Sequence, residues 1–240
     1  MTETPTPEQV RARIEAIRAA RGFVLPHHGA MAAALPELHD AYEAMYRALT
    51  LDRRHLTPFE REAVWLAILA ACEEPVGTHH LAKFSAAGGT AAQAAAIFRL
   101  AAWAAGAARY AMIAEAWQAH VPAIPAAREY LDGAEALLRG APIPLPLARL
   151  CLVGVQTAAD QPFGLGAEIE AAYAAGVPEP CIAEAMSLAI WPRGVNRFVR
   201  ATALWLALIR AGRVTPSAPF RAWAETEGQG AFVLPPAPAG

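Results

Sequence analysis

Apolar residues recur every three to four positions along most of the chain, the spacing of one helix face, and no stretch alternates apolar and polar residues as a half-buried strand does. Pro and Gly residues divide this pattern into segments. The predicted helices cover residues 8–21, 31–49 with a kink or start at Pro36, 58–72, 78–87, 90–120 with a break near Gly106, 126–138, 147–160, 165–175, and 178–211 with an interruption at 192–194. The sequence therefore predicts an all-α protein.

Two segments fall outside these helices. Residues 23–29 are predicted to form a turn or loop, and the tail after Thr215, rich in Pro, Gly and Ala, to wrap or fray. The clearest linker is the Pro-rich run 140–146. We expect three parts: N-terminal helices plus a first helical unit over residues 1–125, a connecting helix and linker over 126–146, and a second unit plus the tail over 147–240.

The chain matches itself at a shift of 88 residues. The shift brings identical and distinctive residues into register: Pro58 and Pro146, Ala86-Ala87-Gly88 and Ala174-Ala175-Gly176, Trp103 and Trp191, Gly106 and Gly194, Arg109 and Arg197, Trp117 and Trp205. Such matches at one shift are hard to obtain by chance, even in an Ala-rich chain. The sequence therefore predicts a tandem duplication of one helical unit.

The two predicted units differ in their polar residues. Residues that both units share are expected to serve the fold, whereas unshared residues are candidates for a site. At the shift of 88 residues Arg61 matches another arginine, Arg149. The other polar residues of the first unit meet different residues in the second: Glu62 meets Leu150, Cys72 meets Asp160, His79 meets Ala167, and His80 meets Glu168. Only the first unit keeps a set of acids and histidines.

That set flanks the predicted helix 58–72. The helix begins with Thr-Pro-x-Glu, in which Thr suits the N-cap and Glu60 completes a capping box, so Glu60 has a structural explanation. Glu62 has no such explanation and is the better candidate for an acid. His79 and His80 follow a Pro/Gly bend. Because the acids lie at the far end of this hairpin from the bend, we expect a neighbouring helix or subunit to be needed to bring them to the histidines.

The composition favours a protein that buries part of its apolar surface in contacts between subunits. Hydrophobic residues make up 55% of the chain and charged residues 18%, and the mean hydropathy is +0.25. Because this is rich in apolar surface for a monomer, we expect subunit contacts in a homo-oligomer, a dimer or trimer. No run of about 18 strongly apolar, uncharged residues without helix breakers occurs, so no membrane span is predicted.

Other features narrow the class of protein. The net charge is −2 with no basic tract, which argues against nucleic acid as a partner. The N-terminus lacks the basic start and apolar stretch of a signal peptide, so the expected location is cytoplasmic. The three cysteines form no CxxC pair and the adjacent histidines lack the i,i+4 ligand spacing, so neither a disulfide framework nor a metal or other cofactor is predicted.

The first unit resembles the carboxymuconolactone decarboxylase and alkylhydroperoxidase D (AhpD-like) family. The family signature is a Glu, eleven residues, CxxC, three residues and a His, followed eight residues later by the Gly of an Ala-Gly pair. Here Glu60, Cys72 and His79 fall at the family spacings, with Pro75 in place of the second cysteine. The resemblance covers residues 22–117 and, through the repeat, 145–212.

A second register of the same signature is equally open. Counted back from Gly88, the family histidine is His80, and the two CxxC positions hold Glu73 and Val76. A one-residue insertion in the bend at 74–78 would reconcile the two registers.

The resemblance implies AhpD-like helical units that assemble as oligomers, with two branches of chemistry. The peroxidase branch needs a thiolate and a second thiol three residues away, and in either register at least one is missing. The decarboxylase branch does without CxxC and uses acid/base groups on a small lactone carboxylate, for which a histidine oriented by a glutamate is suited at neutral pH. A substrate carboxylate would also need a cation.

We therefore expect a Cys-independent acid/base enzyme, a decarboxylase or isomerase acting on a small carboxylate or lactone, with lyase chemistry favoured over peroxidase chemistry. The candidate catalytic residues are His80, His79, Glu62, Glu60 and Cys72, and the candidate substrate-binding residues are Arg61, Arg193 and Asn196. The alternatives are a peroxidase that uses Cys72 alone with an external thiol, and a non-catalytic oligomeric protein that binds a small ligand.

Overall fold

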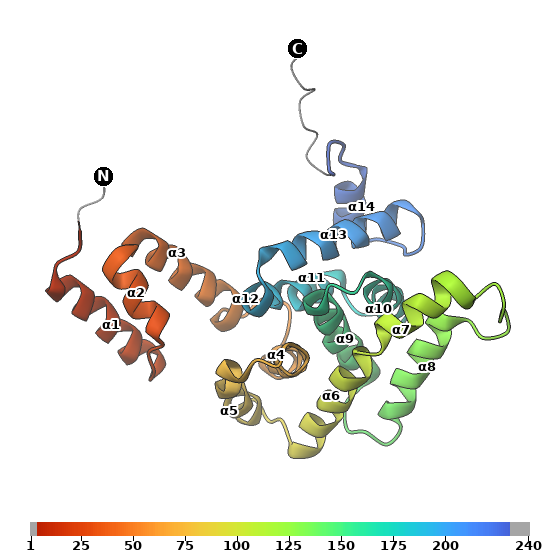
Figure 1. Cartoon of the computed structure of the whole chain (residues 1–240), viewed down its shortest axis with the longest axis horizontal. Helices are drawn as coiled ribbons and strands as arrows, with labels where there is room; N and C mark the ends of the chain where they lie inside the picture. Colours follow the sequence, from red (N-terminus) through yellow and green to blue (C-terminus); the bar gives the residue numbers. More distant parts are fainter. Residues whose placement is uncertain (1–3, 231–240) are drawn as a thin grey trace, which may run out of the picture. The chain divides into compact units, whose positions relative to one another are not determined.

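The computed structural model describes residues 4–230, and every regular element in this range is a helix (Figure 1). The all-α prediction is confirmed. The chain divides into two compact units, one ending at Asp52 and one beginning at Arg53. The predicted boundaries at 125 and 146 stay a prediction, and the division between Asp52 and Arg53 was not predicted.

The first compact unit contains α1 (Pro7–Arg21), α2 (Pro26–Ala34), α3 (Pro36–Tyr46) and the π-helical turn η1 (Arg47–Leu51). The predicted helix start at Pro36 is confirmed. The loop predicted for residues 23–29 is wrong in its second half, because α2 already begins at Pro26. Proline at the first helical position presets the backbone, and the backbone N–H of Leu25 donates to Nδ1 of His28 (3.1 Å), which replaces the usual cap.

The second compact unit contains the remaining helices. They are α4 (Pro58–Cys72), η2 (Pro75–Thr78), α5 (His79–Ala86), α6 (Ala91–Ala104), α7 (Ala107–Met112), η3 (Ile113–Trp117), α8 (Ala126–Leu138), α9 (Leu145–Ala159), α10 (Pro162–Ala174), α11 (Glu179–Leu188), α12 (Ile190–Arg193), α13 (Val195–Arg210) and α14 (Ala218–Glu225). The predicted break near Gly106 and the interruption at 192–194 are confirmed.

The core of this unit forms around α4 and α9, which pack on each other and are flanked by α5, α6, α10 and α11 (Figure 1). Helix α9 is buried along most of its length, and α4 is buried continuously from Glu62 to Ile68. Gly154 of α9 permits their close approach, because a Cβ there would lie 2.9 Å from Cγ1 of Val64 and 3.0 Å from Cδ1 of Ile68. The site candidates on α4 are therefore held by a closely packed helix pair.

The tail prediction is wrong in one respect, because residues after Thr215 include helix α14. Its aromatic side chains pack on α13: the ring centroids of Phe220 and Trp223 lie 4.9 and 5.7 Å from that of Trp205. Two aromatic residues three positions apart form one apolar helix face, a signal too short to stand out in a Pro- and Gly-rich segment. Residues 231–240 lie outside the described part of the chain.

The ends of the helices refine the register of the predicted repeat. Helices α4 and α9 have 15 residues each, and each is followed by a residue in the left-handed conformation, Glu73 (φ 54°) and Asp160 (φ 57°), 87 positions apart. Beyond the bend, Gly88 and Gly176 both have positive φ and are 88 positions apart. Thus the uniform shift of 88 residues is wrong for α4 and α9 by one residue. The duplication itself stays a prediction.

One helical run among the described residues, Ala91–Trp117, has the length and mean hydropathy (1.2) of a membrane span. Core helices of soluble proteins pass the same test. The part of this run that forms α6 packs on α4 and α9 and buries Ile97 and Leu100. The run therefore gives no clear sign of a membrane protein.

Candidate acid/base site

The start of α4 uses Glu60 as a helix cap. The Thr57 hydroxyl accepts from the backbone N–H of Glu60 (3.2 Å), and the Glu60 carboxylate accepts from the backbone N–H and the hydroxyl of Thr57 (2.9 and 2.8 Å). This reciprocal arrangement is a capping box. Glu60 is thus engaged in holding the helix start, as its spacing predicted, and takes no part in the contact that follows.

Glu62 and His80 form a buried hydrogen-bonded pair. Nδ1 of His80 lies 2.6 Å from Oε2 of Glu62, and the two residues are 3% and 2% exposed. Glu62 comes from the second turn of α4 and His80 from the first turn of α5. We expected that a further helix or a second subunit would be needed to bring the acids to the histidines. For Glu62 this is wrong, because α5, which carries His80, packs directly on α4.

The protonation of His80 follows from its surroundings. Burial lowers the pKa of the imidazole below its usual value, and the hydrogen bond to Glu62 opposes this shift only in part. Near neutral pH the ring is therefore uncharged. Because a carboxylate can only accept, we infer that Nδ1 carries the proton and that Nε2 holds the lone pair. No described residue hydrogen-bonds to Nε2 of His80.

Trp65 packs directly on this imidazole. The two ring centroids lie 4.6 Å apart with an interplanar angle of 26°, which is a stacked arrangement. The indole Nε1–H is buried, and among the described residues it has no hydrogen-bond partner. A buried donor without a partner is costly and calls for an explanation. Sequence reasoning missed Trp65. A signal was present, because the residue at the matching position of the second predicted unit is aliphatic and Trp65 is therefore not shared.

Arg61 and His79 border the pair without joining it. Nε of Arg61 lies 3.8 Å from Oε1 of Glu62, which places a cation beside the carboxylate. The His79 ring lies 4.3 Å from that of His80. Burial, together with the neighbouring imidazole, lowers the pKa of His79 to about 4, so it is also neutral at pH 7. The 2.6 Å contact with Glu62 is made by His80.

Cys72 lies at the other end of α4. It is ten residues from Glu62, or roughly 15 Å along the helix axis. Nε of Arg193 lies 3.1 Å from its sulfur, and Nη2 of Arg193 donates to its carbonyl oxygen (3.1 Å). Burial nevertheless raises the pKa of the thiol. Arg193 therefore belongs to the Cys72 end of α4 and is not assembled with His80, and Asn196 of α13 is exposed.

The second half carries a different pair at the matching place. The shift of 87 residues along α9 makes Arg149 the counterpart of Glu62, and the shift of 88 beyond the bend keeps Glu168 as the counterpart of His80. Nη1 of Arg149 donates to Oε2 of Glu168 at 3.0 Å, and the residues are 2% and 0% exposed. Glu135 of α8 binds the other side of the guanidinium (2.5 Å). Arg149 and Glu168 therefore form a buried ion pair.

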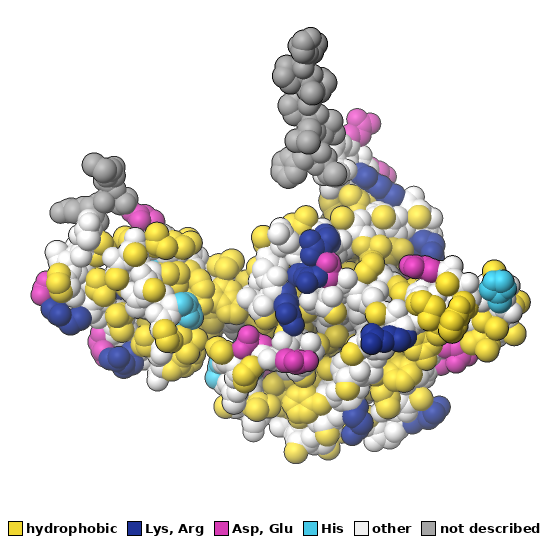
Figure 2. Space-filling model, in the orientation of Figure 1, with side chains coloured by type: hydrophobic (Ala, Val, Ile, Leu, Met, Phe, Trp, Pro, Cys, Tyr) yellow, Lys and Arg dark blue, Asp and Glu magenta, His cyan; other side chains and the backbone are white. Residues whose placement is uncertain are grey.

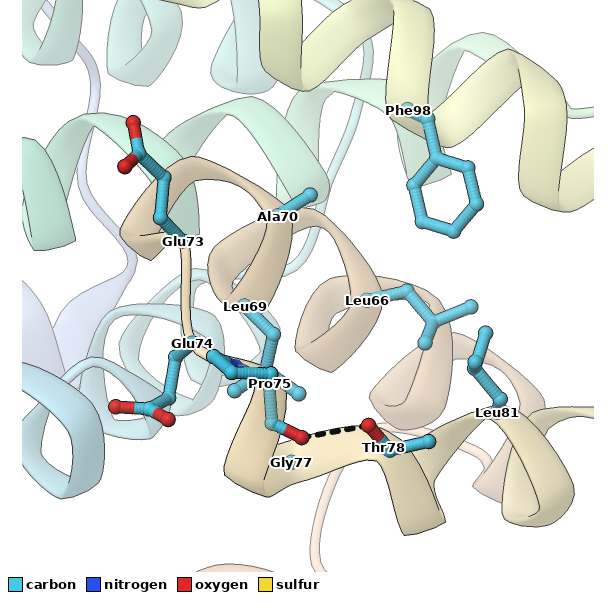
Figure 3. A pocket seen from close by; sticks show the side chains of 10 residues that line it. All are labelled: Leu66, Leu69, Ala70, Glu73, Glu74, Pro75, Gly77, Thr78, Leu81 and Phe98. Carbon is cyan, nitrogen blue, oxygen red and sulfur yellow. Dashed lines mark hydrogen bonds between the residues drawn. The ribbon is translucent and has the colours of Figure 1, made fainter.

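A shallow apolar groove lies beside α4 and α5 (Figure 3). Its volume is about 450 Å³, and the side chains of Leu66, Leu81 and Phe98 converge on it, whereas the Glu73 and Glu74 carboxylates point away from them. The Thr78 hydroxyl is bound to the Pro75 carbonyl. Neither Glu62 nor His80 lines this groove, and it presents no cation to a substrate carboxylate.

Within residues 4–230 no group of three His, Cys, Asp or Glu side chains is placed to hold a metal ion. Comparisons with known proteins give no further guide: no family model, no curated protein and no solved structure matches this chain. The chemistry of the site must therefore be argued from its own residues.

Proposed function

We propose that this chain is an acid/base enzyme that moves a proton on a small carboxylate or lactone, with His80 as the base and Glu62 as the group that orients it. The observation that carries the proposal is the 2.6 Å contact between His80 Nδ1 and Glu62 inside the core. A buried acid that fixes the tautomer of a histidine leaves the opposite ring nitrogen available to a substrate.

The neutral state of His80 favours a step that begins with proton removal. Nε2 takes a proton from the carbon next to the substrate carbonyl, and the electron pair moves onto the carbonyl oxygen. In isomerisation the imidazolium, stabilised by Glu62, then returns the proton to another carbon. In decarboxylation no carbon-bound proton is removed: the C–C bond to the carboxylate breaks, its electron pair moves onto the conjugated carbonyl oxygen as carbon dioxide leaves, and His80 passes a proton taken from solvent to the carbon that held the carboxylate. Neither reaction needs a thiol.

The indole N–H of Trp65 favours a substrate that has a carbonyl group. Its buried indole N–H lacks a partner in the described part of the protein and lies on the ring stacked against His80. An oxygen that gains negative charge as His80 removes the proton would pair with this donor, and such donors act most strongly in a buried site. Arg61 lies beside Glu62 and brings a positive charge to the site.

The same geometry favours one register of the family resemblance. If the histidine of the signature is His80, the CxxC positions are Glu73 and Val76, and neither has a thiol. Cys72 keeps a raised pKa and lies about 15 Å along α4 from Glu62. Since the thiolate is the reactive form, we propose membership of the decarboxylase branch of the AhpD-like family rather than the peroxidase branch.

The test is exchange of carbon-bound protons with solvent. The protein is incubated in D₂O with a panel of small unsaturated γ-lactone carboxylates, and loss of the signal next to the carbonyl is followed by proton NMR. His80→Ala should slow the exchange by about 100-fold or more, the range for loss of a general base. In the wild type the rate should stay constant through neutral pH and fall only below pH 6.5, because burial lowers the pKa of His80 and protonated His80 is no longer a base.

Matched substitutions on α4 provide the controls. Glu62→Gln removes the orienting acid and should slow exchange, whereas Glu60→Gln, two residues away, keeps the capping box and should leave the rate unchanged. Cys72→Ser should also leave it unchanged. A wild-type protein that exchanges none of the panel, or one whose activity depends on Cys72 and not on His80, contradicts the proposal.

A further inference from the structure

A cavity distinct from the apolar groove lies away from the Glu62–His80 pair, between α9, α10 and α13. Its volume is about 220 Å³. A water molecule takes about 30 Å³ in the liquid, so the cavity is large enough for a small organic molecule. Its walls are partly apolar, with Leu165 and Leu204 facing the space along with Ala201. No step of the proposed proton transfer uses this cavity.

Two fully buried side chains at this cavity have unpartnered polar atoms. Gln156 and Thr157 are 0% and 1% exposed, and the described residues provide no partner for Oε1 of Gln156 or for the Thr157 hydroxyl. The amide nitrogen of Gln156 is satisfied, since it donates to the Ala104 carbonyl and the Tyr130 hydroxyl (both 3.0 Å). Because both residues line the cavity, we infer that these two atoms face it and that the floor offers one acceptor and one hydroxyl to a bound group.

Two arginines border the same cavity on its exposed side. Arg197 and Arg200 of α13 share the carboxylate of Asp160, at 2.5 and 2.8 Å, and their side chains are 31% and 54% exposed. Each guanidinium gives one nitrogen to Asp160, and the three groups together keep a net positive charge. Figure 2 shows Lys and Arg side chains gathered over α12 and the start of α13 on this face. The mouth is thus suited to an anion.

We propose that this cavity binds a short hydroxycarboxylic acid. The ligand carboxylate pairs with Arg197 and Arg200 at the mouth, since arginine matches carboxylate geometry. The ligand hydroxyl reaches the floor, where it donates to Oε1 of Gln156 and accepts from the Thr157 hydroxyl. The short carbon chain between them packs on Leu165. This assignment satisfies both buried polar atoms and is independent of the proposed acid/base chemistry.

The test uses 3-hydroxybutyrate as the probe and isothermal titration calorimetry as the readout. Butyrate, which lacks the hydroxyl, and 1,3-butanediol, which lacks the carboxylate, are the comparison ligands. The wild type should bind 3-hydroxybutyrate more tightly than either. Thr157→Val, which keeps the side-chain shape, should reduce 3-hydroxybutyrate to the affinity of butyrate. Arg200→Gln should weaken binding by about tenfold, as for loss of a hydrogen bond to a charged group.

Arg213→Gln is the matched control for Arg200→Gln. Arg213 is similarly exposed (60%) and also forms an ion pair, with Glu170, but it does not line the cavity. It should leave binding unchanged, and so should His80→Ala. The proposal is overturned if 3-hydroxybutyrate shows no saturable binding, if butyrate binds equally well, or if Arg213→Gln weakens binding as much as Arg200→Gln.

Discussion

Two buried pairs occupy matching places in the two halves of the second compact unit and differ in their chemistry. Glu62 and His80 join α4 to α5, whereas Arg149 and Glu168 join α9 to α10. In both pairs one partner lies early on a central helix and the other on the helix after the bend. The same backbone geometry therefore supports an acid with an imidazole in one half and a guanidinium with an acid in the other.

The difference concerns which protons can move. Arginine stays charged at any physiological pH, so Arg149 itself cannot act as a base. Glu168 is surrounded by protein, and burial raises its pKa to about 7 although Arg149 opposes the shift. In the Glu62 pair, burial instead lowers the pKa of His80 and leaves a neutral imidazole. Under the proposed function, the Glu62–His80 pair carries the proton transfer and the Arg149–Glu168 pair stabilises the fold of the second half.

Breaking the second pair should have the largest effect on stability. Arg149→Met keeps much of the side-chain volume and leaves Glu168 buried without its cation. We expect it to lower the free energy of unfolding by about 3–5 kcal/mol, as for a buried pair that loses one partner. The corresponding change in the first half, Glu62→Gln, should cost only about 1 kcal/mol, since a hydrogen bond to the neutral imidazole remains possible. Urea unfolding followed by circular dichroism measures both.

The double variant Arg149→Met, Glu168→Leu tests whether the second pair serves only the stability of the fold. Because it removes both charges, it should recover most of the stability that Arg149→Met loses. Its activity in the proton-exchange assay should equal that of the wild type. A double variant that folds well and yet loses exchange would show that the second pair also serves the chemistry, and the division of roles would fail.

The two halves should also respond to pH in opposite directions. The pKa of Glu168 is raised in the folded state, so its contribution is fully present below pH 4.5 and is lost as pH rises to about 7. The pKa of His79 is lowered to about 4, so its contribution is present above pH 6.5 and is lost as pH falls toward 4. The expected size of each change is on the order of a few kcal/mol.

Single substitutions separate these two trends. The stability of the wild type relative to Glu168→Gln should decline between pH 4.5 and 7, and that relative to His79→Gln should rise over the same interval. Unfolding midpoints in urea at pH 4.5, 5.5 and 7 give both differences. Parallel curves for the wild type and Glu168→Gln would mean that the carboxyl is not held protonated by its burial.

Much of the fold was predictable because helix boundaries are set locally. Thr57, Pro58 and Glu60 fix the start of α4 through their own side chains, and Gly22 ends α1 with positive φ. Helix α14 was missed because its stability comes from packing on Trp205, a contact that no local pattern encodes. The predicted shift of 88 residues fits the two glycines beyond the bend, Gly88 and Gly176, whereas the residues that end α4 and α9 lie 87 positions apart.

The site was only partly predictable for the same reason. Spacing separated Glu60 as a cap from Glu62 as a candidate, and both assignments agree with the observed hydrogen bonds. Spacing could not show that His80 rather than His79 contacts the acid, because adjacent residues point in different directions and α5 decides which one faces α4. Arg193 was grouped with the histidines, yet α12 places it against Cys72.

The smallest expected effect tests the packing of α4 on α9, which holds both pairs in place. Gly154→Ala introduces a Cβ 2.9 Å from Val64, and relief of this contact must push the helices apart or shift the Val64 side chain. Overpacking costs about 1–3 kcal/mol, while alanine gains up to about 1 kcal/mol in helix propensity. We expect a net loss of about 1 kcal/mol in the free energy of unfolding, and slower proton exchange if the helices separate.

Gly166→Ala on α10 is the control, because no atom lies within 4 Å of its added Cβ, so it should stabilise the protein. Stabilisation by both substitutions would show that α4 and α9 have room to spare, and the precise positioning of His80 would then have to come from α5 alone.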